Sequence, residues 1–457
     1  MSWICGELFV TILVLGYGSS GRAAEKLARK LGYDVEVLTD EKSTSSGKDV
    51  AEDSSPPRGG QETSATNGGA AFAVVSPGVP LTSPLIAECR GKGIPLKSEL
   101  QFGCEELKRQ GWKLLAVTGS KGKSSVVKVV ADAINLAGMH AVACGNYGRP
   151  VSDVALELGS GKDFASPVDG ADGEKASVTS ITGDAESFPL CRYAVVEVSS
   201  FMMETTELPA DTFEAAAILN LQEDHLDRHG SVEVYHALKR KLLTMAKRGV
   251  VAEVSRPPRG GQESSATLEL FAGSYFDNDI LKTNARCAVA LMRTAGLSDA
   301  DIAVAFKEFV PLPHRMNRVA TIDGIEYIDD SKATSLAALS AGVVMASTST
   351  FNLQPRIRLI AGGLPKGDDP KSVVSILTER VKKVYLIGQS AEAFASAWKS
   401  CVDCEICGTM EAAVAAVKRD AAKGDKVLLS PGTASFDQFK SFGERGDVFA
   451  RLVKKEK

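Results

Sequence analysis

The chain has 457 residues, of which 44% are hydrophobic and 24% are charged, and its formal net charge is −4. This composition is that of an ordinary globular protein, and it lacks the basic excess that nucleic-acid binding requires. At roughly 100–200 residues per domain, the length predicts about three domains. No run of about 18 uninterrupted apolar residues is present, so we expect no membrane insertion.

The first predicted element is a buried strand at residues 10–15. The residues before it include Glu7 and no basic cluster, so we interpret them as part of the folded chain and not as a signal peptide. The strand leads into Gly16–Gly21, GYGSSG, a pattern typical of dinucleotide sites, with Asp40 as the acidic residue about 20 positions further on. This turn alone leaves an NAD-type enzyme open.

Three polar tracts interrupt the chain. SSPPRGGQETSAT at 54–66 returns as SRPPRGGQESSAT at 255–267, identical at eleven of thirteen positions, and a third polar stretch covers 159–188. Because these tracts contain almost no apolar periodicity, we predict solvent-exposed insertions and not a folding repeat.

A strand at 114–118 is followed by the glycine-rich turn TGSKGKSS and an apolar helical pattern. The backbone N–H groups of such a turn, together with the helix N-terminus, bind anions. The turn departs from the long P-loop pattern, because Val117 stands where that pattern has a glycine. We still predict a phosphate site in which Lys123 reaches the β/γ-phosphates and Ser124 binds Mg²⁺.

Polar residues also follow the next two apolar runs. Glu197 lies among the apolar residues of YAVVEVSSF, at the end of a predicted central strand, where a buried carboxylate requires a partner such as a cation. His225 and His229 are spaced i, i+4 in HLDRH, but the glutamate of H-E-x-x-H is missing, which disfavours a zinc protease. Lys239 lies in a helical pattern with no acidic residue one turn away, and the pattern alone leaves its role open.

The C-terminal third alternates strands with polar loops, namely LPHR, IDDSKATS, AGGLPKG and SPGTASFDQF. Alternating strands and helices predict the α/β class with parallel sheets, whose ligands gather at the carboxyl ends of the strands. Cys401, Cys404 and Cys407 form C-x₂-C-x₂-C, but the fourth position is Glu411, and strand alternation sends neighbouring cysteines to opposite faces. We therefore expect no metal cluster there, and the odd total of nine cysteines indicates a reducing compartment.

The order TGSKGKSS, VEVSSF, LNLQEDHLDRHG, YHALKRK, LPHR, IDDSKATS, AGGLPKG and LSPGTASFDQFKSFGERG resembles the Mur ligases of peptidoglycan synthesis. The resemblance implies a Rossmann-like UDP-substrate domain at 1–101, a central P-loop ATPase domain with a mostly parallel sheet at 102–311, and a Rossmann-like amino-acid-binding domain at 312–457 that closes over the site. It also implies a cytoplasmic, monomeric enzyme that uses ATP to convert a carboxylate into an acyl phosphate, which an amine then displaces. Within the family, the motifs are most similar to members that add D-glutamate to UDP-N-acetylmuramoyl-L-alanine.

The resemblance also assigns site residues. The ATP-binding positions are Gly119, Ser120, Lys121, Gly122, Lys123, Ser124, Ser125, Asn284, Arg315, Asp330 and Lys332. The UDP-substrate positions are Gly18, Ser19, Ser20, Asp40, Ser76, Pro77 and Gly78. The D-glutamate positions are Thr334, Lys366, Ser435 and Phe442. The catalytic positions are Lys123, Asn146, His225 and Lys239, and the Mg²⁺ positions are Ser124, Glu197, His225 and a carbamylated Lys239.

Two points qualify these assignments. Carbamylation needs a neutral amine, so we expect Lys239 to lie where its charge is disfavoured. The adenine-side pattern H-N-x-x-N of the family survives only as Asn284, because Leu281 replaces the earlier asparagine. The alternatives to a D-glutamate ligase are another Mur-type ligase, a folylpolyglutamate-type ligase and a non-catalytic nucleotide-binding relative.

Overall fold

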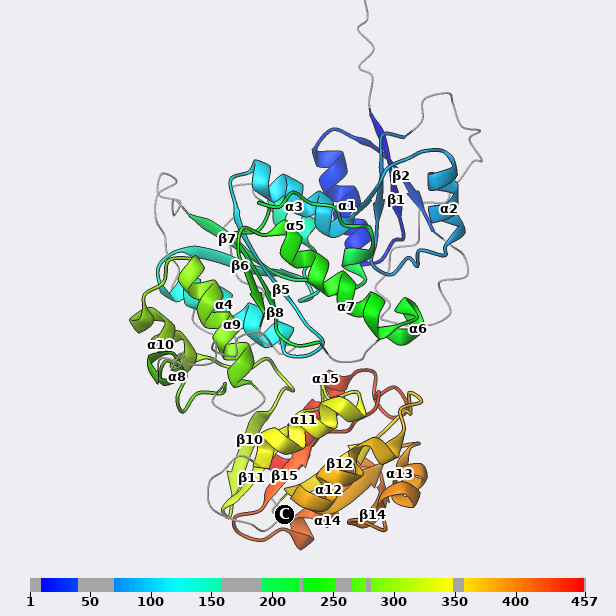
Figure 1. Ribbon diagram of the computed structural model, residues 1–457. Helices are drawn as coiled ribbons and strands as arrows, with labels where there is room; N and C mark the ends of the chain where they lie inside the picture. The colour runs from blue at the N-terminus through cyan, green and yellow to red at the C-terminus, as the bar shows by residue number, and fades with distance from the viewer. Residues whose placement is uncertain are drawn as a thin grey trace, which may run out of the picture. The chain divides into compact units, whose positions relative to one another are not determined.

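The structure, a computed structural model, describes residues 10–39, 70–157, 191–221, 225–251, 265–276, 281–347 and 357–455. Asp40 and the tracts 54–66 and 159–188 lie outside these ranges, and only residues 265–267 of the second repeat copy are described. The chain divides into two compact units (Figure 1). The first is Met1–Ala272 with Thr283–Lys307, and the second is Gly273–Lys282 with Glu308–Lys457.

The first sheet of the first unit has four parallel strands in the order β2-β1-β3-β4. Its elements are β1 (Thr11–Leu15), α1 (Ser19–Lys30), β2 (Asp34–Leu38), β3 (Ala73–Val75), α2 (Pro84–Gly91) and β4 (Leu96–Ser98). The predicted strand at 10–15 is confirmed as β1, which lies inside the sheet with four of its five residues buried. The glycine turn after β1 therefore stands at the carboxyl edge of this sheet.

The second sheet of this unit has five parallel strands in the order β6-β7-β5-β8-β9. Its strands are β5 (Lys113–Thr118), β6 (His140–Gly145), β7 (Arg192–Glu197), β8 (Ala215–Ile218) and β9 (Gly249–Val251). Its helices are α4 (Lys123–Leu136), α6 (Leu226–His229), α7 (Val232–Lys241), α8 (Ser265–Glu269), α9 (Lys282–Thr294) and α10 (Asp299–Glu308), with the 3₁₀ turns η2 (Met202–Thr205) and η3 (Leu242–Met245). The predicted strand at 114–118 is confirmed as β5, which is the middle strand of this sheet.

The two sheets of the first unit share one hydrophobic core. Helices α3 (Glu99–Arg109) and α5 (Val151–Glu157) contribute to it, and Leu107 packs in the same cluster as Ile12 of β1 and Leu114 of β5. Gly103 brings α3 close to α5, because a Cβ at this position would lie 2.8 Å from the backbone nitrogen of Ser152. The predicted domain boundary at 101 falls inside α3, and the division into three domains stays a prediction.

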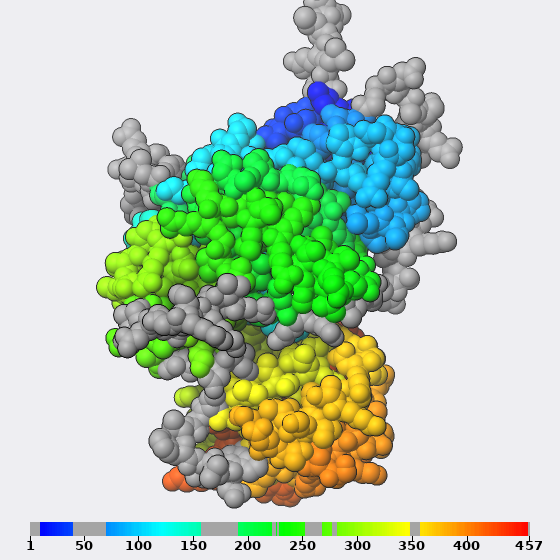
Figure 2. Space-filling view, in the orientation of Figure 1, coloured from blue at the N-terminus to red at the C-terminus, as the bar shows by residue number. Residues whose placement is uncertain are grey.

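The second unit is built on a six-stranded sheet in the order β10-β11-β15-β12-β13-β14, in which β10 is antiparallel to β11 and the other pairs are parallel. In Figure 2 the part of this unit that begins at Glu308 is coloured from yellow-green to red. The strands are β10 (Asn317–Ile322), β11 (Ile325–Asp329), β12 (Ile357–Gly362), β13 (Val381–Ile387), β14 (Asp403–Gly408) and β15 (Lys426–Leu429). The helices are α11 (Leu336–Ser347), α12 (Val374–Arg380), α13 (Ala391–Trp398), α14 (Met410–Asp420) and α15 (Phe442–Lys454), with the 3₁₀ turn η5 (Pro370–Val373).

Helices cover both faces of this sheet. Residues of α11, α12 and α13 pack in one cluster with β12 and β13, and residues of α14 and α15 pack in another. The predicted α/β class is therefore confirmed. None of the helices in the described ranges has the length and hydropathy that crossing a membrane requires.

The two cysteines of β14 follow the predicted strand alternation, whereas Cys401, which precedes this strand, packs against the same cluster as Cys404. Cys404 packs against the α11–α13 cluster, whereas Cys407 packs against the α14–α15 cluster. Burial raises the pKa of each thiol to about 11, and each donates to a nearby backbone carbonyl. The two thiols are therefore protonated at neutral pH and lie on opposite faces of the sheet.

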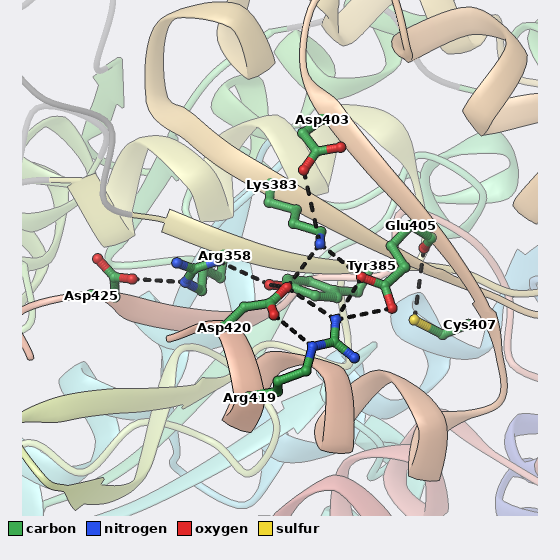
Figure 3. A network of polar contacts seen from close by, with 9 residues as sticks. All are labelled: Arg358, Lys383, Tyr385, Asp403, Glu405, Cys407, Arg419, Asp420 and Asp425. Atoms are coloured by element: carbon green, nitrogen blue, oxygen red, sulfur yellow. Dashed lines mark hydrogen bonds and ion pairs between the residues drawn. The ribbon is translucent and has the colours of Figure 1, made fainter. Parts of the chain in front are cut away.

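A polar network ties α14 to β13 and β14 (Figure 3). Lys383 Nζ lies 2.8 Å from Asp420 Oδ2 and 2.7 Å from Glu405 Oε2. Arg419 binds the same two carboxylates, at 2.8 Å from Asp420 Oδ1 and 2.9 Å from Glu405 Oε2. The hydrogen bond from Arg419 is the largest cause that lowers the pKa of Asp420. Because cations and carboxylates alternate, the network fastens the helix to the sheet.

Candidate active site

The phosphate loop lies between β5 and α4 at the carboxyl edge of the central sheet. Its backbone turns through Gly122, at φ +83°, and a Cβ there would clash with the side-chain amide of Asn284 on α9. The structure thus brings Asn284, which is 3% exposed, against the loop. Asn220, after β8, pins the loop from the other side, because its Oδ1 accepts from Lys121 N at 2.8 Å and its Nδ2 donates to Lys121 O at 2.9 Å.

Two lysine amines converge on this loop. Lys123 Nζ donates to Gly119 O at 2.8 Å and to Ser120 O at 3.2 Å. Lys239 Nζ, from α7, donates to the same Gly119 O at 3.0 Å. Lys239 is 1% exposed and lies 4.5 Å from the centroid of the Tyr235 ring. The Lys123 amine adds its charge to the N-terminus of α4, which suits a phosphate group, and the buried Lys239 amine lies beside it.

Glu197 ends β7, the neighbour of β5 in the sheet. The register pairs Val117 with Glu197 and Gly145 with Glu197, which places the carboxylate beside both adjoining strand ends. Asn146 donates from Nδ2 to Glu197 Oε1 at 3.0 Å. The other oxygen, Oε2, is buried and has no hydrogen-bond partner among the described residues. A buried carboxylate oxygen without a donor is a suitable ligand for a cation.

The two histidines of HLDRH have different environments. His225 is exposed, has a φ of +53°, and its ring packs on Phe201 with 4.9 Å between centroids. His229 is buried, and its Nε2 lies 3.0 Å from Ser200 Oγ. Burial lowers the pKa of His229, so its ring is neutral at physiological pH. His225, the predicted site residue, is therefore the more accessible of the pair.

The predicted UDP-substrate loops lie side by side at the edge of the first sheet. Ser76 Oγ donates to Gly16 O at 3.0 Å, which joins the turn after β3 to the turn after β1. Gly21 has no room for a side chain, because a Cβ there would overlap Gly16 O. Gly18 and Ser19 are exposed at the N-terminus of α1, and Gly78 is also exposed. Ser20 and Pro77 are half-buried in these same turns.

In the second unit, two predicted nucleotide residues, Asp330 and Lys332, follow β11. Asp330 is buried, accepts from Ser430 Oγ at 2.9 Å, and burial raises its pKa to about 7. Arg315 precedes β10, and its charge opposes part of that rise. Lys332 Nζ lies 5.0 Å from the centroid of the Phe442 ring. Lys332 and Phe442, assigned to different ligands, therefore lie next to each other.

Backbone hydrogen bonds tie together the loops that carry the predicted D-glutamate residues. Leu364 N donates to Ala434 O at 3.0 Å and Ala434 N donates to Leu364 O at 3.2 Å, which joins the Lys366 loop to the Ser435 loop. Gly432 N donates to Ala333 O at 2.8 Å, next to Thr334. Lys366 is exposed, Thr334 is half-buried, and Ser435 is buried. The three loops leave the carboxyl ends of β11, β12 and β15.

Two family models match the chain, the Mur ligase middle domain at residues 117–256 and the Mur ligase, glutamate ligase domain at residues 314–432. The UDP-N-acetylmuramoylalanine–D-glutamate ligase of Dechloromonas aromatica is 31% identical over 478 residues, which cover 97% of each chain. The ligase of the same name from Acidobacterium capsulatum is 30% identical, and the alignment covers 97% of this chain and 95% of that protein. The chain belongs to the Mur ligase family.

Solved structures agree with this family fold. The UDP-N-acetylmuramate-alanine ligase MurC of Thermotoga maritima has a TM-score of 0.53 at 15% identity, covering 97% of this chain and 98% of that chain. The MurF ligase of Thermotoga maritima, solved in complex with ADP, has a TM-score of 0.52 at 14% identity, covering 85% of this chain and 90% of that chain. At these identities the likeness shows the fold of a Mur ligase.

Three residues that hold the loops of this Mur ligase were missed in the sequence. Asn220 pins the phosphate loop, and Arg228 joins the first two sheets. Arg445, which is 0% exposed, donates to Ser331 O at 2.9 Å, to Thr433 O at 3.2 Å and to Ala434 O at 3.1 Å. All three lie inside quoted motifs, but each has a partner that is distant in the chain, at 99, 149 and 114 residues respectively, so no local pattern shows their role.

Proposed function

We propose that this Mur ligase is an ATP-dependent ligase that adds D-glutamate to UDP-N-acetylmuramoyl-L-alanine during peptidoglycan precursor synthesis. The observation that carries the proposal is the convergence of Lys123 and Lys239 on Gly119 O at the N-terminus of α4. The choice of substrates rests on the D-glutamate ligases that match the chain over nearly its full length. The eight described cysteines are free thiols, which supports the cytoplasm as its location.

The reaction must activate a carboxylate, which is a poor acyl donor because its charge repels nucleophiles. Transfer of the γ-phosphoryl group from ATP to the L-alanyl carboxylate gives an acyl phosphate, and the amine of D-glutamate then displaces phosphate. Most of this catalysis is positioning and neutralisation of crowded negative charge. Lys123 and the loop N–H groups would hold the phosphates, and Asn146 would orient the substrate beside Glu197.

A Mg²⁺ ion fits the residues at the end of β7, because Glu197 Oε2 is buried without a donor among the described residues. Ser124 and Glu197 would hold one ion, and His225 with a carbamylated Lys239 would bind in the second-metal region. Within the described ranges, no group of three or more His, Cys, Asp or Glu side chains gathers around one point. That fits a site completed by a hydroxyl, phosphate oxygens and a carbamate, where the ion neutralises phosphate charge when bound.

In the second unit, Thr334, Lys366, Ser435 and Phe442 would hold D-glutamate. Lys366 is exposed in its loop and carries the charge that a carboxylate requires. Ser435 and Thr334 would orient that carboxylate through their hydroxyls, and the Phe442 ring would limit the size of the pocket. The ties between the three loops support this assignment, because they keep the recognition groups together.

The test is phosphate release from ATP by the purified full chain with UDP-N-acetylmuramoyl-L-alanine. D-Glutamate should stimulate release, whereas L-glutamate, L-alanine and meso-diaminopimelate should not. Release that is indifferent to D-glutamate would refute the assignment and indicate another Mur-type or folylpolyglutamate-type ligase. The absence of any release would indicate a non-catalytic nucleotide-binding relative.

A further inference from the structure

Arg228 and Glu204 form a buried ion pair outside the reacting groups described above. Arg228 Nε lies 3.0 Å from Glu204 Oε1, and its Nη2 lies 2.6 Å from Oε2, so the guanidinium engages both carboxylate oxygens. The side chains are 16% and 7% exposed, respectively. Glu204 lies in η2, after β7, and Arg228 lies in α6, after β8. Both residues therefore lie in segments that follow strands of the five-stranded sheet.

The same guanidinium reaches the first sheet. Its Nη2 donates to Val79 O at 2.9 Å and to Pro77 O at 3.3 Å, across 149 and 151 residues of sequence. These carbonyls lie in the turn after β3, to which the predicted UDP-substrate residues Ser76, Pro77 and Gly78 belong. An arginine guanidinium can donate to acceptors on two sides at once, because its N–H donors lie in one plane and point in fixed directions. Arg228 thus connects the turn after β3, which carries predicted UDP-substrate residues, with the carboxyl end of the five-stranded sheet.

Phe201 extends this connection to His225. The Arg228 Cζ atom lies 4.7 Å from the centroid of the Phe201 ring, and the His225 ring packs against that ring at 4.9 Å. The His229 ring lies 5.4 Å from it, and His229 Nδ1 is 3.4 Å from Glu204 Oε1. A shift of Arg228 would therefore move the aromatic surface on which His225 rests.

We propose that Arg228 is a positioning residue that fixes the turn at 76–79 relative to His225 and so aligns the UDP-linked substrate with the reacting end of the site. This inference rests on the proposed function. The contacts of Arg228 with the carbonyls of Pro77 and Val79 affect substrate binding, whereas its ion pair with Glu204 affects the stability of the fold. The two effects can be separated because they use different acceptors.

The experiment compares Arg228→Gln, Glu204→Gln and the double variant in the full chain. Arg228→Gln should raise the KM for UDP-N-acetylmuramoyl-L-alanine by about tenfold or more, and leave the KM for ATP within about twofold. It should also lower the Tm, because the Glu204 carboxylate is left buried without its main cation. The double variant should recover the Tm but keep the raised KM, because the carbonyls of Pro77 and Val79 still lack the guanidinium.

Arg109→Gln is the matched control, since Arg109 binds Glu106 at 2.7 Å on α3 and is 69% exposed. It should change neither KM. The positioning role would be overturned if the double variant recovered the wild-type KM as well as the wild-type Tm. It would also be overturned if Arg228→Gln raised the KM for ATP as much as the KM for the UDP-linked substrate. Calorimetric titration with UDP-N-acetylmuramoyl-L-alanine measures this binding without turnover. If the proposed function is wrong, the wild-type chain will not add D-glutamate. If only the positioning role of Arg228 is wrong, the wild type will be active and the KM values of the variants will not follow the expected pattern.

Discussion

Replacing Asp330 with asparagine should stabilise the second unit at alkaline pH. The Asp330 carboxyl group is 8% exposed, accepts a hydrogen bond from Ser430 Oγ, and would lie 2.6 Å from a Cβ at Gly342. Burial raises its pKa from the ordinary 3.8 to about 7, against the opposing charge of Arg315. The folded chain therefore holds this proton in a pH range where the unfolded chain has released it.

The sign and size of the effect follow from proton linkage. Between pH 3.8 and about 7 the folded state binds more protons than the unfolded state, so the free energy of unfolding falls as pH rises through this window. At about 1.4 kcal/mol per pH unit, the loss between roughly pH 5 and pH 8 is about 3 kcal/mol. An asparagine side chain cannot ionise, so the Asp330→Asn variant escapes this loss and can still accept from Ser430.

Thermal unfolding at pH 5 and pH 8 measures the difference. At roughly 2–4 °C per kcal/mol, the Tm advantage of Asp330→Asn should grow by about 6–12 °C between the two pH values. Asp323→Asn is the control, because Asp323 is exposed in the turn between β10 and β11 and its φ of +51° suits asparagine. Parallel pH profiles for the wild type and Asp330→Asn would refute the reasoning. Phosphate release should fall in the stabilised variant, since Asp330 is assigned to the nucleotide.

Three further changes test the site. Lys239→Ala should lower phosphate release about a hundredfold, and added short carboxylates should restore part of it by taking the place of a carbamate; absence of rescue would argue against carbamylation. Glu197→Gln should raise the Mg²⁺ concentration for half-maximal activity by about tenfold, and an unchanged Mg²⁺ dependence would remove Glu197 from the metal site. Arg445→Lys keeps the charge but loses the fork to three carbonyls, so the KM for D-glutamate should rise about tenfold while that for the UDP-linked substrate stays constant. Equal rises in both KM values would mean that Arg445 acts on folding alone.

Much of the α/β framework could be predicted because its signals are local. The strand at 10–15, the strand at 114–118 and the glycine turns after them each follow from a short run of residues. The alternation that separates Cys404 from Cys407 needs only the two-residue period of a strand. The sequence also predicts a phosphate site at Gly119–Ser124. Because Val117 departs from the long P-loop pattern, that prediction rests on the order of the motifs along the chain.

The sequence by itself determined the strands and the glycine turns that follow them, because strand periodicity and glycine turns are properties of neighbouring residues. Tertiary structure decided which of these segments meet. Arg228 reaches Val79 across 149 residues, and Arg445 reaches Ser331 across 114, through contacts that exist because strand order brings their turns together. Lys239 likewise meets Gly119 O across 120 residues. Strand order depends on the packing of whole sheets, and no single stretch of sequence encodes it.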